Sequence, residues 1–136
     1  MKFYIKPCFS KEKSYYSLLT SFLIFSFSIY YIIYNKSTVY LQYLLFLVGF
    51  ISIIHHCRSF SDEYYDFIRI LDIVFANILG IYILYLYQNY LTFGILIIIS
   101  FLFLYTQNKC KSSKNQSFLH SFIHMLVCMI LVFNNP

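Results

Sequence analysis

Residues 38–56 read TVYLQYLLFLVGFISIIHH, a run that contains no lysine, arginine, aspartate or glutamate. A helix needs about 20 such residues, each rising ~1.5 Å, to cross a hydrocarbon core ~30 Å thick. Apolar stretches of similar length occupy residues 15–34, 67–87, 90–106 and 117–133. The sequence therefore predicts an all-α, multi-pass transmembrane bundle of about five helices, with residues 1–136 forming one domain.

The composition of the 136-residue chain supports this class. Hydrophobic residues make up 60% of it and charged residues 11%, against roughly 25% charged residues in an ordinary soluble domain. A soluble domain of this length leaves ~30% of its unfolded-chain surface exposed, which so apolar a chain cannot cover. Disorder requires the opposite composition. We expect an integral membrane protein, in a membrane that the sequence does not identify, with its first apolar stretch retained as a helix instead of being cleaved as a signal peptide.

The positive charges predict an orientation. With five spans, the N-terminus, the second loop and the fourth loop share one side, and only Lys36 lies on the other. The positive-inside rule then places the N-terminus in the cytoplasm, and the same distribution argues against nucleic acid as a partner. The residues on the predicted cytoplasmic side are Lys2, Lys6, Lys11, Lys13, Arg58, Arg69, Lys109, Lys111 and Lys114.

The cysteines do not predict a disulfide framework. Cys8, Cys57 and Cys110 fall on the predicted cytoplasmic side, where thiols stay reduced. Lipidation of these three is left open. Cys128 lies within the last span, where we expect a small apolar core residue.

A few ionisable residues lie inside the spans, where each costs several kcal/mol and requires a cause. His55 and His56 end the second span, Asp72 lies about one turn into the third, and His120 and His124 lie in the first half of the fifth. The second span ends on the side where the third and fifth begin. All five residues are therefore predicted to lie near one face of the membrane, whichever way the chain is inserted.

Helical spacing predicts which way these side chains point. His120 and His124 are four residues apart and share a face, as do Ser52 and His56. Asp72 begins a stripe that continues through Ala76 and Gly80, and small residues are typical of close contacts between transmembrane helices. We therefore expect His56 and Asp72 to face the interior of the bundle.

Three imidazoles from two helices indicate a zinc site with three protein ligands and an open fourth position for water. A buried zinc ion makes hydroxide available near neutral pH. Asp72 could orient a ligand or shuttle a proton, and Ser52 could donate a hydrogen bond to a developing oxyanion. Such a site near the membrane edge would act on an amide or ester bond of a lipid.

Other interpretations of the same residues stay open. Asp72 and Arg69 could form a buried ion pair that serves assembly, and His120 and His124 could hydrogen-bond across helices. A histidine at a helix end, such as His55, is often interfacial. Two histidines on facing helices could also hold haem. Asp66, in the second loop, could reach the site in place of Asp72.

The ordered set of polar residues resembles the CREST superfamily of membrane hydrolases, which includes alkaline ceramidases, progestin and adiponectin receptors and myomaker-like proteins. The resemblance lies in Ser52-Ile-Ile-His55-His56, in Leu71-Asp72-Ile73 and in the pair His120 and His124. It implies that His56, or His55 as the alternate ligand, binds zinc with His120 and His124. It also implies that Asp72 contacts the metal-bound water and that Ser52 supports the reaction. The family has seven helices, two more than this chain is predicted to have.

Two functions are carried forward. The first is a zinc-dependent membrane hydrolase that cleaves a lipid amide such as ceramide, with the bilayer and a lipid substrate as its partners. The second is a non-enzymatic multi-pass membrane protein, structural, fusion-related or receptor-like, that keeps a CREST-like fold. Oligomerisation is compatible with either function.

Overall fold

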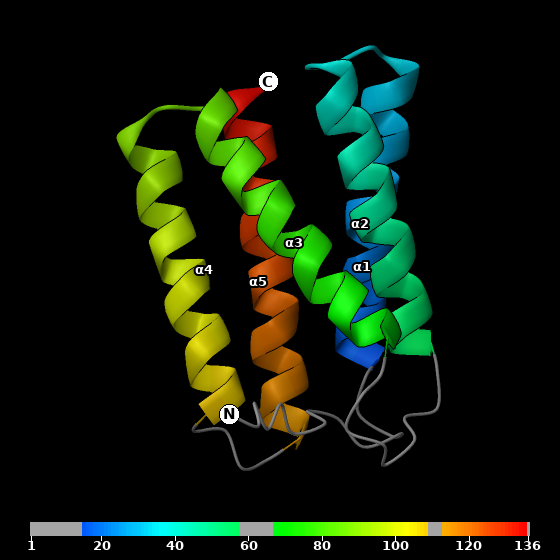
Figure 1. Cartoon of the computed structure of the whole chain (residues 1–136), viewed down its shortest axis with the longest axis vertical. Coiled ribbons are helices and arrows are strands. Elements are labelled where there is room, and N and C mark those ends of the chain that lie inside the picture. Colours follow the sequence, from blue (N-terminus) through cyan, green and yellow to red (C-terminus); the bar gives the residue numbers. More distant parts are fainter. Residues whose placement is uncertain (1–14, 58–66, 109–112, 136) are drawn as a thin grey trace.

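The computed structural model describes residues 15–57, 67–108 and 113–135 of the chain. These residues form five α-helices, which confirms the predicted all-α bundle (Figure 1). The helices are α1 (Tyr15–Ile33), α2 (Val39–Cys57), α3 (Phe67–Leu86), α4 (Tyr90–Asn108) and α5 (Ser113–Asn134).

Four of the helices are long and apolar enough to cross a membrane. They are α1, α2, α3 and the Ser117–Asn134 part of α5, whereas the apolar part of α4, Tyr90–Thr106, is shorter. α5 begins at Ser113, four residues before the predicted span, and these four additional residues form a polar first turn. Hydropathy marks only the apolar part of a helix, so it could not place this turn.

The five helices form a closed ring. Each helix contacts its neighbour in sequence, and the contact between α1 and α5 closes the circle. Five alternating helices cannot all be antiparallel to both neighbours, so α1 and α5 run parallel. In Figure 1, α3 crosses the bundle obliquely, starting beside the end of α2 and finishing near α4. The α3–α4 contact is the smallest of the five.

α1 and α2 pack closely because small residues line their interface. Ser21 of α1 is completely buried, and its Oγ lies 2.9 Å from the Oγ of Ser52 of α2. At Gly49 of α2, an added Cβ atom would lie 2.8 Å from the Cα atom of Phe25. Only glycine permits this approach of the two backbones.

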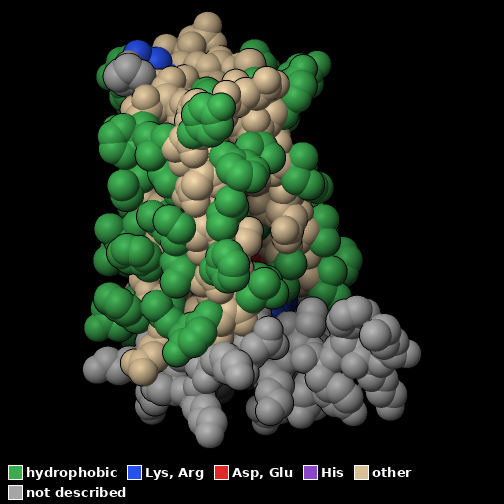
Figure 2. Space-filling model, turned by 90° about the vertical axis from the view of Figure 1, so that its left-hand side faces the viewer, with side chains coloured by type: hydrophobic (Ala, Val, Ile, Leu, Met, Phe, Trp, Pro, Cys, Tyr) green, Lys and Arg blue, Asp and Glu red, His purple; other side chains and the backbone are tan. Residues whose placement is uncertain are grey.

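The outer surface of the bundle is apolar along its length. Figure 2 shows hydrophobic side chains over one flank of the described part of the chain. Tyr43, Ile81 and Phe101 are among the large side chains that are more than 60% exposed. A continuous apolar surface of this kind is unfavourable in water and matches a lipid environment. The chain thus has the surface of a membrane protein.

A hydrogen-bonded network joins the helices at the end of the bundle where α1, α3 and α5 finish. Tyr31 donates from its hydroxyl to the carbonyl oxygen of Leu131 at 2.9 Å. Asn134 accepts from Asn89 at 2.8 Å and donates to Thr92 at 3.1 Å. We call this region the asparagine end. Its contacts tie α1 to α5 and α4 to α5.

Most of the charges that predict the orientation lie outside the described residues, so the cytoplasmic N-terminus stays a prediction. These are Lys2, Lys6, Lys11, Lys13, Arg58, Lys109 and Lys111. Cys8 and Cys110 also lie outside the described part. Cys57 is exposed and Cys128 is buried, and both are free thiols. Cys128 belongs to the apolar core, as predicted.

Candidate metal site

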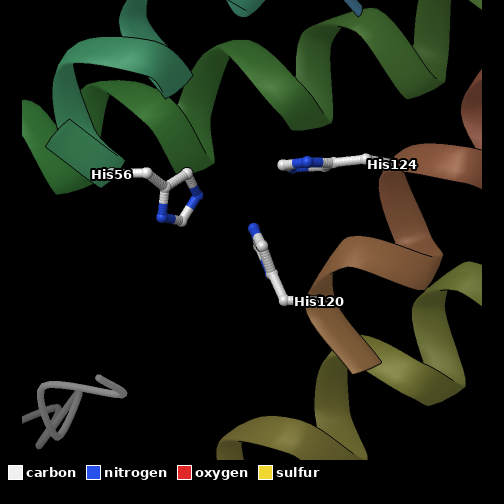
Figure 3. Close-up of side chains that lie close together, drawn as sticks. All are labelled: His56, His120 and His124. Carbon is white, nitrogen blue, oxygen red and sulfur yellow. The ribbon is translucent and has the colours of Figure 1, made fainter. Parts of the chain in front are cut away.

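Three of the predicted ligands come together inside the ring. One nitrogen from each of His56, His120 and His124 can be chosen so that all three lie within 4.8 Å of one another. The ring centroids are 5.2 Å apart for His56 and His120, 5.9 Å for His56 and His124, and 4.6 Å for His120 and His124. Figure 3 shows the three rings directed into one shared space. The histidines predicted to meet therefore do so.

The helices explain this convergence. His120 and His124 project from one face of α5 because they are one turn apart, and His56 lies in the last turn of α2. α1 lies between α2 and α5 in the ring and contacts both, so it fixes the distance across which the histidines face each other. His56 is 2% exposed and His124 is 8% exposed. We call the region around these side chains the histidine end.

His55 belongs to a second group of potential ligands. His55, His56 and Asp72 also offer atoms that lie within 4.8 Å of one another, and all three residues are buried. The centroids of the His55 and His56 rings are 4.8 Å apart. His56 is thus shared by both groups, whereas His55 is grouped with Asp72 and not with the α5 histidines. This arrangement favours His56 as the ligand that acts together with His120 and His124.

Ser52 lies between α1 and the carboxyl group of Asp72. Its Oγ is 2.9 Å from the Oγ of Ser21, and its side chain is also hydrogen-bonded to Asp72. Ser52 is 1% exposed and Asp72 is 7% exposed. The predicted catalytic pair is therefore buried and in contact, beside the histidines.

Helix α1 contributes two site neighbours that the sequence analysis missed. The Oγ1 of Thr20 lies 2.9 Å from the Nδ1 of His124, and Ser21 contacts Ser52 as described above. A signal was present, because Thr20 and Ser21 are polar residues within the first apolar span. It could not be interpreted without knowing that α1 packs against both α2 and α5.

An apolar cavity of about 400 Å³ adjoins the cluster and occupies the inside of the ring. Ser52, Asp72, His120 and His124 form its polar wall, and the rest of the lining comes from all five helices. Its volume falls within the ~300–1,000 Å³ typical of small-molecule sites. Asp72, His120 and His124 are thus within reach of a molecule bound in the cavity.

The small-residue stripe on α3 has a different role from the predicted one. Asp72 faces the interior as expected, but Gly80 has no heavy atom within 4 Å of the position that a Cβ atom would take. Ala76 and Gly80 both line the cavity. The expected close helix contact is therefore wrong at Gly80, and the missing side-chain volume helps to keep the cavity open.

The other interpretations of the polar residues are an ion pair, a hydrogen bond across helices, haem binding and a role for Asp66. The charge of Arg69 acts on Asp72, so the ion-pair interpretation stays a hypothesis. The contact between His124 and Thr20 shows that one α5 histidine does hydrogen-bond across helices. Haem binding stays an untested hypothesis. Asp66 lies outside the described residues.

Comparisons with known proteins assign no relative: no family model, no curated protein and no solved structure matches this chain.

Proposed function

We propose that this chain is an integral-membrane, zinc-dependent hydrolase that cleaves a lipid amide such as ceramide. The observation that carries the proposal is the meeting of His56, His120 and His124 within 4.8 Å of one another, with Asp72 and Ser52 beside them at an apolar cavity. The order of the same residues along the chain, which resembles the CREST superfamily, supports it.

The three histidines suit zinc. Catalytic zinc sites use three protein ligands, commonly imidazoles, and leave a fourth position open. In this chain His56 would supply one ligand from α2, and His120 and His124 would supply two from α5. Zinc bound there would polarise a carbonyl group and make water nucleophilic near neutral pH. The supporting feature is that the donors already face one another from two helices.

Asp72 would transfer the proton, and Ser52 would stabilise the negative charge that develops on the carbonyl oxygen. Water attacks the carbonyl carbon of the amide, and Asp72 accepts the proton that the water loses. Once Asp72 is protonated, the single hydroxyl hydrogen of Ser52 turns from Asp72 to the carbonyl oxygen and donates to it as that oxygen gains negative charge. The carbon–nitrogen bond then breaks, and Asp72 returns the proton to the leaving nitrogen. The products are a fatty acid and an amine.

The cavity would hold the hydrocarbon part of the substrate. Apart from the polar wall, its lining is mainly aliphatic, including Ile83, Ile99 and Val127. On the α3–α4 side, Leu96 and Leu104 line both this cavity and a groove on the outer surface. A lipid chain could therefore enter from the bilayer between α3 and α4, where the ring has its smallest contact. This access favours a membrane lipid over a water-soluble substrate.

The experiment starts with the metal. Protein purified in detergent, stripped with chelator and reloaded with zinc sulfate is expected to retain one zinc ion per chain. Removal of two imidazoles in the His120→Ala/His124→Ala variant should abolish this binding. An Asn89→Ala/Asn134→Ala variant, altered at the asparagine end, is the matched control and should retain the zinc. Helical circular dichroism checks that each variant is folded.

Hydrolysis is then tested on the zinc-loaded protein. Ceramide in mixed micelles should release fatty acid, which mass spectrometry detects, and the double histidine variant should release none. Wild-type protein that binds no zinc, or a double variant that binds as much as wild type, contradicts the proposal. Zinc binding without hydrolysis of ceramide or other lipid amides would instead identify the non-enzymatic membrane protein, with the metal serving its stability.

A further inference from the structure

We infer that Thr20 of α1 is a positioning residue that fixes the tautomer of His124 and so prepares this histidine to bind a metal. The inference rests on the proposed zinc site and adds to it a residue from a helix that supplies no ligand. It follows from three distances around one hydroxyl group.

The hydroxyl of Thr20 has a single hydrogen and three polar neighbours. Its Oγ1 lies 3.0 Å from the carbonyl oxygen of Tyr16 and 3.1 Å from that of Ser17. Its third neighbour is the Nδ1 of His124, at 2.9 Å. Carbonyl oxygens can only accept hydrogen bonds, so both carbonyl contacts require the hydrogen of Thr20.

This hydrogen count assigns the direction of the third contact. We assign this single hydrogen to the carbonyl oxygens of its own helix, which the Oγ1 of Thr20 faces at 3.0 and 3.1 Å, so that Oγ1 meets His124 with a lone pair. The Nδ1 of His124 must then carry the proton and donate it to Thr20. In a neutral imidazole with a proton on Nδ1, the Nε2 holds the free lone pair. Thr20 therefore selects Nε2 of His124 as the metal-binding atom.

Metal-binding histidines in proteins generally use this arrangement. The ring nitrogen that does not bind the metal donates to a neighbouring oxygen, which holds both the tautomer and the ring orientation. Loss of such a partner typically costs about 10–100-fold in metal affinity. Thr20 is suited to this role because α1 contacts both α2 and α5, the two helices that carry the ligands.

Zinc affinity measured by competition with a chromophoric chelator tests the inference. Thr20→Val keeps the shape of the side chain and removes the hydroxyl, so we expect it to weaken zinc binding about 10–100-fold. Thr20→Ser restores the hydroxyl and should restore the affinity. Ser26→Ala is the matched control, since Ser26 of the same helix donates to the carbonyl oxygen of Phe22 at 2.8 Å.

Two further measurements separate positioning from packing. The visible spectrum of the cobalt-substituted protein should change in Thr20→Val and return in Thr20→Ser. Nitrogen-15 NMR of the zinc-free wild type should find the His124 proton on Nδ1. Should Thr20→Val unfold, Thr20→Ala gives the same comparison with Thr20→Ser.

The outcomes distinguish this inference from the function on which it rests. Wild-type zinc affinity in Thr20→Val, or a proton on Nε2 of His124, overturns the role of Thr20 and leaves the zinc site standing. A wild-type protein without zinc affinity overturns both.

Discussion

The two ends of the bundle use polar side chains in different ways. At the asparagine end, Tyr31, Asn89 and Asn134 form hydrogen bonds that link neighbouring helices. At the histidine end, His56 and the two α5 histidines direct their rings into a shared space beside a cavity. The first pattern joins helices in pairs, whereas the second gathers donor atoms at one point.

This difference separates polar residues that hold a membrane protein together from those that suit a ligand. A hydrogen bond between transmembrane helices contributes only about 0.6 kcal/mol on average. Such a gain explains the contacts of Asn134 but does not require three imidazoles to meet. The convergence of the three imidazoles is explained if they bind one metal ion together. Changes at the histidine end should therefore affect function strongly, and changes at the asparagine end should affect stability weakly.

Among the single substitutions that test this comparison, the largest effect is expected from Asp72→Asn at the histidine end. This change keeps the size of the side chain and removes its ability to accept and return a proton. The turnover of ceramide should fall about 10²–10⁴-fold, because Asp72 would act as the general acid and base. Zinc content should stay at the wild-type level, since the proposed ligands are the three histidines.

The measurement is fatty-acid release together with metal analysis on the same sample. Full turnover in Asp72→Asn would assign Asp72 to assembly, for instance as the partner of Arg69. The histidine end would then resemble the asparagine end, and the comparison would lose its basis.

An intermediate effect is expected from Gly49→Ala, which acts on the packing behind the histidine end. A Cβ at this position would lie 2.8 Å from the Cα of Phe25, so α1 and α2 must separate. Overpacking of this kind costs about 1–3 kcal/mol in unfolding free energy. Gly80→Ala is the matched control: it has open space and should stabilise α3 by about 0.5–1 kcal/mol.

Reversible unfolding in detergent measures both variants. Equal stabilities for Gly49→Ala and Gly80→Ala would show that α1 and α2 do not approach as closely as described. The positions of Thr20 and Ser21 at the site depend on that approach.

The smallest effect is expected at the asparagine end from Tyr31→Phe. The change removes one hydrogen bond, to the carbonyl oxygen of Leu131, and leaves the ring in place. Stability should fall by about 0.6 kcal/mol, and zinc affinity should not change. A loss of zinc binding in Tyr31→Phe would show that the two ends are coupled through α1 and α5.

Much of this arrangement could be predicted because membranes impose simple rules. Apolar length indicated the five helices, and the alternation of their directions brought His56, Asp72 and the α5 histidines to one end. Spacing by four residues placed His120 and His124 on one face. None of these steps requires knowledge of which helices touch.

The remainder depended on contacts between distant helices. The roles of Thr20 and Ser21 follow from the position of α1 in the ring, and no local pattern reports that position. Gly80 was misassigned because a small residue permits a close helix contact but does not require one. The polar first turn of α5 was missed because helix formation there does not depend on hydropathy.

The parallel contact of α1 with α5 also bears on how the protein is made. Thr20 and His124 are 104 positions apart, and Ser17 and Ser117 are 100 apart. α1 is synthesised before α5, so the contacts between these two helices form only after α5 has been inserted. Until then the ring stays open and His56 has no α5 histidines to face. Two of the three proposed zinc ligands belong to α5. Zinc would therefore bind only after α5 has packed against α1, and its binding would stabilise the fully assembled bundle.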